Sequence, residues 1–150
     1  MMSEERSEYV LVSLCLLGVL CRFHGKREVM GHRIGRPKLI SGLEKRYRLL
    51  PLCPEQLGGL TTPRPAAKVM SSGRVLTKDG ADVTKEYERG TEIVLEIVER
   101  YGLKRAWLLK DSPACGRGYG ITAKRLEAAG GNGAPYNLPS LSKGTKVTFS

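Results

Sequence analysis

Hydrophobic and polar positions along the chain separate into short apolar runs and longer amphipathic stretches. Three runs, 9–14, 48–53 and 105–110, are apolar and rich in branched side chains, which predicts buried strands. Elsewhere apolar residues recur at helical spacing, which predicts helices over 37–48, 83–102 and 120–130. The second helix is the strongest, and its apolar face is predicted to carry Val83, Tyr87, Ile93, Ile97 and Tyr101.

The remaining segments have the composition of loops and turns. Residues 22–36 are basic and interrupted by glycine, and 58–67 contains two prolines and two adjacent glycines. A small hairpin is predicted over 68–77. Because strands alternate with helices, we predict one α/β domain over 1–130, a layered, Rossmann-like fold with a mainly parallel sheet and helices on its faces. The Gly-, Ser- and Pro-rich segment 131–150 is predicted to be an atypical, poorly ordered tail.

Composition adds a basic charge and few amide side chains. The 150 residues include 25 Lys and Arg against 15 Asp and Glu, a net charge of +10, which favours an anionic partner or a basic solubilising surface. Asn and Gln are nearly absent, as in many heat-adapted proteins. The apolar run 9–21 follows an acidic segment and is too short to span a bilayer. We therefore expect a cytoplasmic protein without a membrane partner.

Three of the four cysteines follow the predicted strands. Cys15, Cys53 and Cys115 each come within a few residues of a strand end. In a parallel sheet the carboxyl ends of the strands share one edge, where ligand crevices form. We therefore expect these three cysteines to converge, although they lie far apart in the sequence.

The cysteine spacing alone leaves three alternatives open: an iron–sulfur cluster, another metal, or buried thiols without a function. Disulfides do not suit a reducing compartment, and the paired Cys-x2-Cys pattern of structural zinc sites is absent. Glu55 lies two residues after Cys53 and Ser112 three residues before Cys115. A carboxylate and a hydroxyl at the same edge would suit proton transfer and substrate binding.

The motifs around these residues resemble those of the thiouracil desulfidases, a small prokaryotic family. The segments are SLCLLGVLC, CPEQLGGLTTPRP, TKDGADVT and SPACG, and the resemblance covers residues 9–130 in order. It implies a [4Fe-4S] cluster held by Cys15, Cys53 and Cys115, with one iron left open for the sulfur of the substrate. It also implies that Glu55 and Ser112 act beside the cluster. Cys21, the second cysteine of the first motif, is a further candidate ligand.

The function implied by the resemblance is non-redox desulfuration of a thiolated pyrimidine to its oxo form and hydrosulfide. The chain departs from the family after SPACG, where a Gly-rich segment is missing, and at Ala114, where a second serine is frequent. The alternative is a nucleotide- or RNA-binding module without catalytic activity. Residues 22–48 hold nine Lys and Arg against two Glu, which suits phosphate contacts or an ordinary solvated surface.

Overall fold

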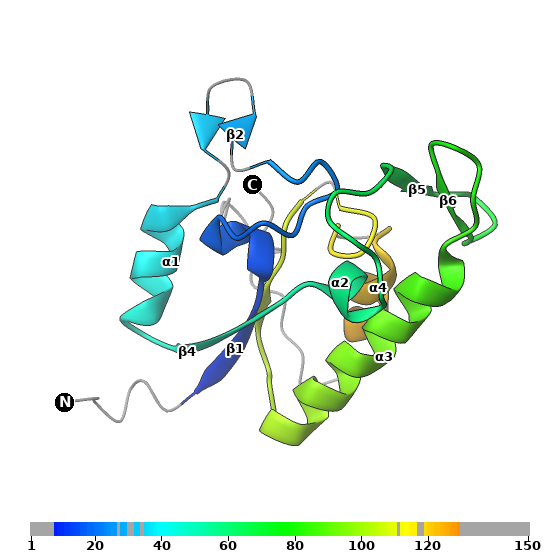
Figure 1. The fold of residues 1–150 in the computed structure, drawn as a ribbon. Helices are drawn as coiled ribbons and strands as arrows, with labels where there is room; N and C mark the ends of the chain where they lie inside the picture. Colours follow the sequence, from blue (N-terminus) through cyan, green and yellow to red (C-terminus); the bar gives the residue numbers. More distant parts are fainter. Residues whose placement is uncertain are drawn as a thin grey trace.

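A parallel sheet with β1 at its centre organises the protein (Figure 1). The computed structural model describes residues 8–26, 28–29, 32–33, 35–110, 112–116 and 119–129. Within these residues the sheet has three strands in the order β4–β1–β7, which span Arg48–Leu52, Tyr9–Ser13 and Ala106–Trp107. All of β1 pairs in parallel with β4, and Leu11 and Val12 pair in parallel with β7.

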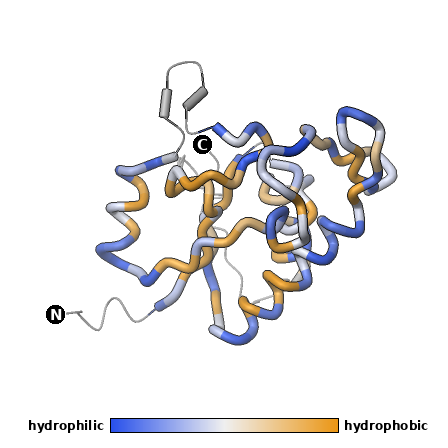
Figure 2. The backbone as a smooth tube through the Cα atoms, in the orientation of Figure 1, coloured by the Kyte–Doolittle hydropathy of each residue, from blue (hydrophilic) through white to orange (hydrophobic). Residues whose placement is uncertain are grey.

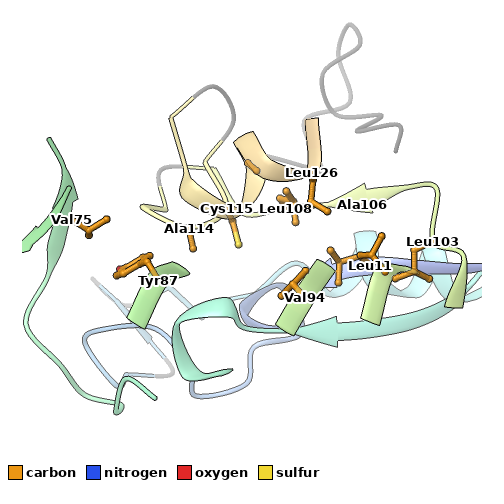
Figure 3. Packing of buried hydrophobic residues seen from close by; sticks show 12 residues of the cluster. Leu11, Val75, Tyr87, Val94, Leu103, Ala106, Leu108, Ala114, Cys115 and Leu126 are labelled. Carbon is orange, nitrogen blue, oxygen red and sulfur yellow. The ribbon is translucent and has the colours of Figure 1, made fainter. Parts of the chain in front are cut away.

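Helices cover both faces of this sheet. Because successive side chains of a strand point to opposite faces, Val10 and Val12 pack with α1 (Pro37–Glu44), and Leu11 packs on the other side. That other side is covered by α3 (Thr84–Tyr101) and α4 (Ile121–Ala129), whose buried residues include Val94 and Leu126 (Figure 3). Figure 2 shows hydrophobic residues along the central strands and hydrophilic residues on the outer turns. The predicted α/β fold is confirmed.

Residues 22–36 and 105–110 differ from the sequence prediction. The loop predicted over 22–36 contains an antiparallel pair, β2 (Glu28–Val29) and β3 (His32–Arg33). The strand predicted over 105–110 is shortened to β7, because the backbone N–H of Leu109 donates to the Ser13 hydroxyl at 2.8 Å. The Ser13 hydroxyl thus takes the place of a backbone partner for Leu109, two residues beyond the end of β7.

The helix predicted over 37–48 ends at Glu44, and a short helix over Pro54–Leu57 was not predicted. The hairpin and the loop before it follow the predicted pattern. Residues 58–66 are irregular, and β5 (Ala67–Val69) and β6 (Val75–Thr77) form the predicted hairpin. The chain leaves α3 through Gly102, whose positive φ of 60° suits glycine. The segment 131–150, predicted to be a tail, lies outside the described residues. In the part of the chain that is described, every helix is too short or too polar to cross a membrane.

The buried face of α3 differs from the predicted one. Tyr87 is buried as predicted, but its companions are Gly90, Thr91, Val94 and Val98, and Tyr101 is exposed. The reason is a close contact with α2 (Pro54–Leu57): a Cβ atom added to Gly90 would lie 1.8 Å from the carbonyl oxygen of Pro54. The buried face of α3 therefore includes small residues. The sequence prediction, which relied on the spacing of large apolar residues, did not include them.

Candidate active site

The four cysteines line a single pocket at the carboxyl ends of the strands. Cys15 lies in the 3-10 turn Leu14–Leu17 after β1, Cys53 directly follows β4, and Cys115 lies between β7 and α4. The cavity has a volume of about 100 Å³, and Glu55 and Ser112 also line it. The structure thus brings together every residue that the sequence assigned to the site.

Cys21 is part of the pocket wall rather than a separate core residue. Interaction with the Cys15 thiol raises the pKa of Cys21 to about 12, whereas interaction with the Cys53 thiol opposes this rise. The thiol of Cys53 also donates to the carbonyl oxygen of Cys21 at 3.9 Å. The hydrogen bond with Cys21 and burial raise the pKa of Cys53 above its ordinary value. The structure therefore couples Cys21 directly to two of the three predicted ligands.

Cys115 is held by the hydroxyl of Ser112. The Ser112 oxygen accepts hydrogen bonds from the backbone N–H groups of Ala114 at 3.1 Å and Cys115 at 3.0 Å, which fixes the turn. Burial raises the pKa of Cys115 to about 12, although hydrogen bonds from Ser13 and Ser112 oppose the shift. In Figure 3 Cys115 and Ala114 lie opposite Tyr87 of α3. Ser13 was missed by the sequence prediction, which treated it only as part of a strand.

The cysteines line the same pocket from separate elements of the fold. Within the described residues, no three His, Cys, Asp or Glu side chains are close enough to hold a single metal ion. Thiolates that bind different atoms of a larger centre stand farther apart than the ligands of one ion. The donors that line the pocket are cysteine thiols, the ligand type that iron–sulfur clusters use.

Glu55 is held from two sides. It lies in the first turn of α2, and its Oε1 accepts a hydrogen bond from the Tyr87 hydroxyl at 2.6 Å. Arg64 forms an ion pair with the same oxygen at 3.0 Å, and the two side chains are only 6% and 12% exposed. Burial and the charge of Glu55 raise the pKa of Tyr87 well above its ordinary range. The carboxylate is thus fixed in a largely buried position.

Arg64 is the main residue that sequence reasoning missed. Its guanidinium also donates to the carbonyl oxygens of Thr61 and Cys21, both at 2.9 Å, and to the hydroxyl of Thr62. An arginine between two prolines, in a loop that the resemblance already singled out, was the available indication. Arg64 lines the pocket and joins the Glu55 side of its wall to the Cys21 side.

Arg22 and Phe23 belong to the outer part of the pocket wall. Phe23 is 38% exposed, and its ring contacts that of His24 edge-on with centroids 5.1 Å apart. Burial lowers the pKa of His24, and the charges of Arg22 and Lys26 lower it further. This part of the wall therefore offers an aromatic face next to positive charge.

Comparison with known proteins decides the family. A family model described as 2-thiouracil desulfurase matches residues 10–135 of the chain. The protein belongs to the 2-thiouracil desulfurase family. This confirms the resemblance seen in the sequence motifs and places the chain among enzymes that cleave carbon–sulfur bonds.

Two individual proteins share this similarity. The uncharacterized protein YbbK of Bacillus subtilis is 28% identical over 144 residues, which cover 81% of this chain and 91% of YbbK. Among solved structures, the [4Fe-4S]-dependent thiouracil desulfidase TudS is 32% identical, with a TM-score of 0.70. That match covers 88% of this chain and 90% of TudS. The structural match therefore covers most of the chain.

Proposed function

We propose that this protein desulfurates a thiouracil-type pyrimidine with a [4Fe-4S] cluster bound by Cys15, Cys53 and Cys115. The observation that carries the proposal is their meeting in one pocket with Glu55 and Ser112. Family membership and the similarity to TudS support the reaction and the cluster. The assignment of individual residues is our own.

The residues of the pocket fit the proposed cofactor. Cysteine thiolates are the usual ligands of iron–sulfur clusters, and here they come from three separate loops around one cavity. A cluster held by Cys15, Cys53 and Cys115 would supply a Lewis-acidic iron for a soft thiocarbonyl sulfur. Cys21 is a fourth thiol in the same wall, and we assign it to the packing of Cys15 and Cys53.

Glu55 and Ser112 would carry the protein's part of the chemistry. We assign Glu55 as the group that takes a proton from the attacking water as it adds to the carbon of the C–S bond. The Ser112 oxygen accepts two backbone N–H groups, and we assign its own proton, which in this structure is directed to Cys115, as a donor to the substrate. Water supplies the oxygen of the oxo product, and the sulfur leaves as hydrosulfide. No net electron transfer is required.

Phe23 and Arg22 would set the substrate class. The exposed ring of Phe23 gives a pyrimidine a surface on which to stack, and Arg22 places a positive charge on the same pocket wall. A substrate with a phosphate group would gain from this charge, in line with the basic region 22–48. The RNA-binding alternative has no further observation in its favour, and part of region 22–48 lies outside the described residues.

Anaerobic reconstitution with iron and sulfide tests the function. We expect a brown protein with visible charge-transfer absorption that converts 2- or 4-thiouracil, or its nucleoside or nucleotide, to the oxo form. Hydrosulfide should appear in equal amount without an added electron donor. A reconstituted cluster without turnover of any of these substrates would contradict the proposal. RNA retention that depends on salt, without cluster absorption, would favour the binding module.

A further inference from the structure

Two side chains bind the same oxygen of Glu55. Oε1 accepts the Tyr87 hydroxyl at 2.6 Å and the Arg64 Nε–H at 3.1 Å, and Arg64 Nη2 lies 3.0 Å away. We propose that Tyr87 and Arg64 are positioning residues that fix the Glu55 carboxylate with Oε2 left available to the cysteine-lined pocket. The proposal rests on the role assigned to Glu55 under the proposed function.

The second carboxylate oxygen of Glu55 differs from the first in its contacts with the described part of the chain. Within the described residues, Oε2 of Glu55 accepts no hydrogen bond, and it is not among the buried atoms left without a partner. Glu55 is itself one of the residues that line the cysteine-lined pocket. The carboxylate is thus asymmetric, with one oxygen bound by the protein and the other free to act.

The hydroxyl of Tyr87 has one evident purpose. The ring is 1% exposed and packs in the core with Val75 and Val94, where phenylalanine would fill almost the same space. A buried hydroxyl costs free energy unless it forms a hydrogen bond, and the bond it forms is to Glu55. The hydroxyl therefore serves the carboxylate and not the packing of α3.

Arg64 is itself fixed in orientation. Nη1 donates to the carbonyl oxygen of Thr61 and the hydroxyl of Thr62, and Nη2 donates to the carbonyl oxygen of Cys21. These bonds turn the edge formed by Nε and Nη2 towards Glu55. Lysine keeps the charge, but it lacks the planar fork that makes all of these bonds at once.

Fixing the carboxylate should raise turnover more than substrate affinity. A glutamate side chain has three rotatable bonds. Rotation about any of them can move the Glu55 carboxylate out of reach of the water that attacks the substrate. Holding the reacting group in place lowers the activation barrier without adding a contact to the substrate. Loss of either positioning residue should therefore lower kcat and leave KM nearly unchanged.

Crystal structures of the Tyr87→Phe and Arg64→Lys proteins give a test that is independent of activity. We expect the cysteines to stay in place while the Glu55 carboxylate spreads over more than one rotamer in each variant. The exposed residues Tyr101 and Arg74 supply the matched controls Tyr101→Phe and Arg74→Lys, which should leave Glu55 in a single conformer. A single, unchanged Glu55 conformer in both test variants would overturn the proposal.

Kinetics of the cluster-loaded variants complete the test. Tyr87→Phe and Arg64→Lys should each lower kcat by about 10-fold to 100-fold, as expected for loss of a charge-assisted hydrogen bond, with normal cluster absorption. In a Glu55→Gln background neither change should lower kcat further, because the carboxylate they position is gone. Equal losses in both backgrounds would mean a general structural role and would overturn the positioning role.

The outcomes separate this inference from the proposed function. If Glu55→Gln is inactive while Tyr87→Phe and Arg64→Lys keep normal kcat, positioning is wrong and the role of Glu55 stands. If Glu55→Gln keeps normal turnover, both assignments are wrong. If the reconstituted protein desulfurates no thio-pyrimidine, the proposed function fails, and the rotamers of Glu55 in the crystal structures still decide whether Tyr87 and Arg64 hold it.

Discussion

Gly90 of α3 lies against the carbonyl group of Pro54, the first residue of α2. A Cβ atom at Gly90 would be 1.8 Å from that oxygen, and one at Gly58 would be 1.9 Å from the carbonyl oxygen of Glu86. Only two facing glycines allow the helices to come this close. The contact fixes α2, which carries Glu55, against α3, which carries Tyr87.

We predict that Gly90→Ala destabilises the protein, because the added methyl group must push α2 away from α3. Overpacking of this kind costs about 1–3 kcal/mol. Gly42 in α1 is the matched control, since a Cβ added there meets nothing within 4 Å. Gly42→Ala should be neutral or stabilise by about 0.5–1 kcal/mol, the helix-propensity gain of alanine over glycine. Urea unfolding monitored by circular dichroism measures the free energy of unfolding of both variants. A Gly90→Ala protein as stable as Gly42→Ala would show that α2 and α3 can adjust to the added methyl group.

Single Cys→Ser variants should divide the four thiols into two groups. We predict that changes at Cys15, Cys53 or Cys115 abolish the stable cluster, because each removes a proposed ligand. Cys21→Ser should keep the cluster, although the Cys21 thiol interacts with those of Cys15 and Cys53. Iron content and visible absorption after anaerobic reconstitution give the answer. Cluster loss in Cys21→Ser together with retention in Cys115→Ser would reverse the ligand assignment.

Glu55→Gln should keep the cluster and the affinity for substrate, because the amide is nearly isosteric with the carboxylate. Turnover should fall by about 10²–10⁴-fold, the usual contribution of a general acid–base group. The exposed Glu88 of α3 provides the control Glu88→Gln, which should retain normal turnover. If Glu55→Gln is active, the next candidate is Asp111, which lies outside the described residues and is tested by Asp111→Asn.

Asp82 should make stability depend on pH. Hydrogen bonds from Thr84, together with Arg74, hold the pKa of Asp82 well below its ordinary value of 3.8. Because the folded state binds the proton more weakly than the unfolded state, the stabilisation is present above pH 3.8 and is lost as the pH falls below it. Relative to Asp82→Asn, the wild-type protein should have a higher urea midpoint at about pH 6 and a smaller advantage at about pH 3.

The control for this pH effect is Asp79→Asn, at an exposed position on the same turn. Its urea midpoint should follow that of the wild-type protein at both pH values. A difference between the wild-type protein and Asp82→Asn that stays constant with pH would show that the charge of Asp82 does not contribute.

The sequence predicted the features that depend on local pattern. The strands at β1 and β4, the helix α3 with its stop at Gly102, and the convergence of Cys15, Cys53 and Cys115 all follow from periodicity and from the geometry of parallel sheets. The motifs also gave the correct family. The catalytic and ligand roles of the named residues stay predictions.

Features that depend on contacts distant in sequence were not predictable. Nothing local to Tyr87 indicates that its hydroxyl meets Glu55, which lies 32 positions away. The early end of β7 depends on Ser13, 96 positions from Leu109. Likewise, the buried face of α3 is determined by the close contact at Gly90, a residue that a hydrophobicity pattern does not select. In each case the deciding interaction forms only when separate elements have already packed.

The position of β1 at the centre of the sheet has a consequence for biosynthesis. Cys15, Cys21 and Cys53 are translated early, but Cys115 and Ser112 leave the ribosome only after the whole of α3 has been made. A nascent chain in which β1 has paired with β4 would thus still lack the side of the pocket formed by Ser112 and Cys115. Ser112 and Cys115 follow β7 in the chain. A cluster bound by Cys15, Cys53 and Cys115 together must therefore be inserted after most of the chain has been synthesised.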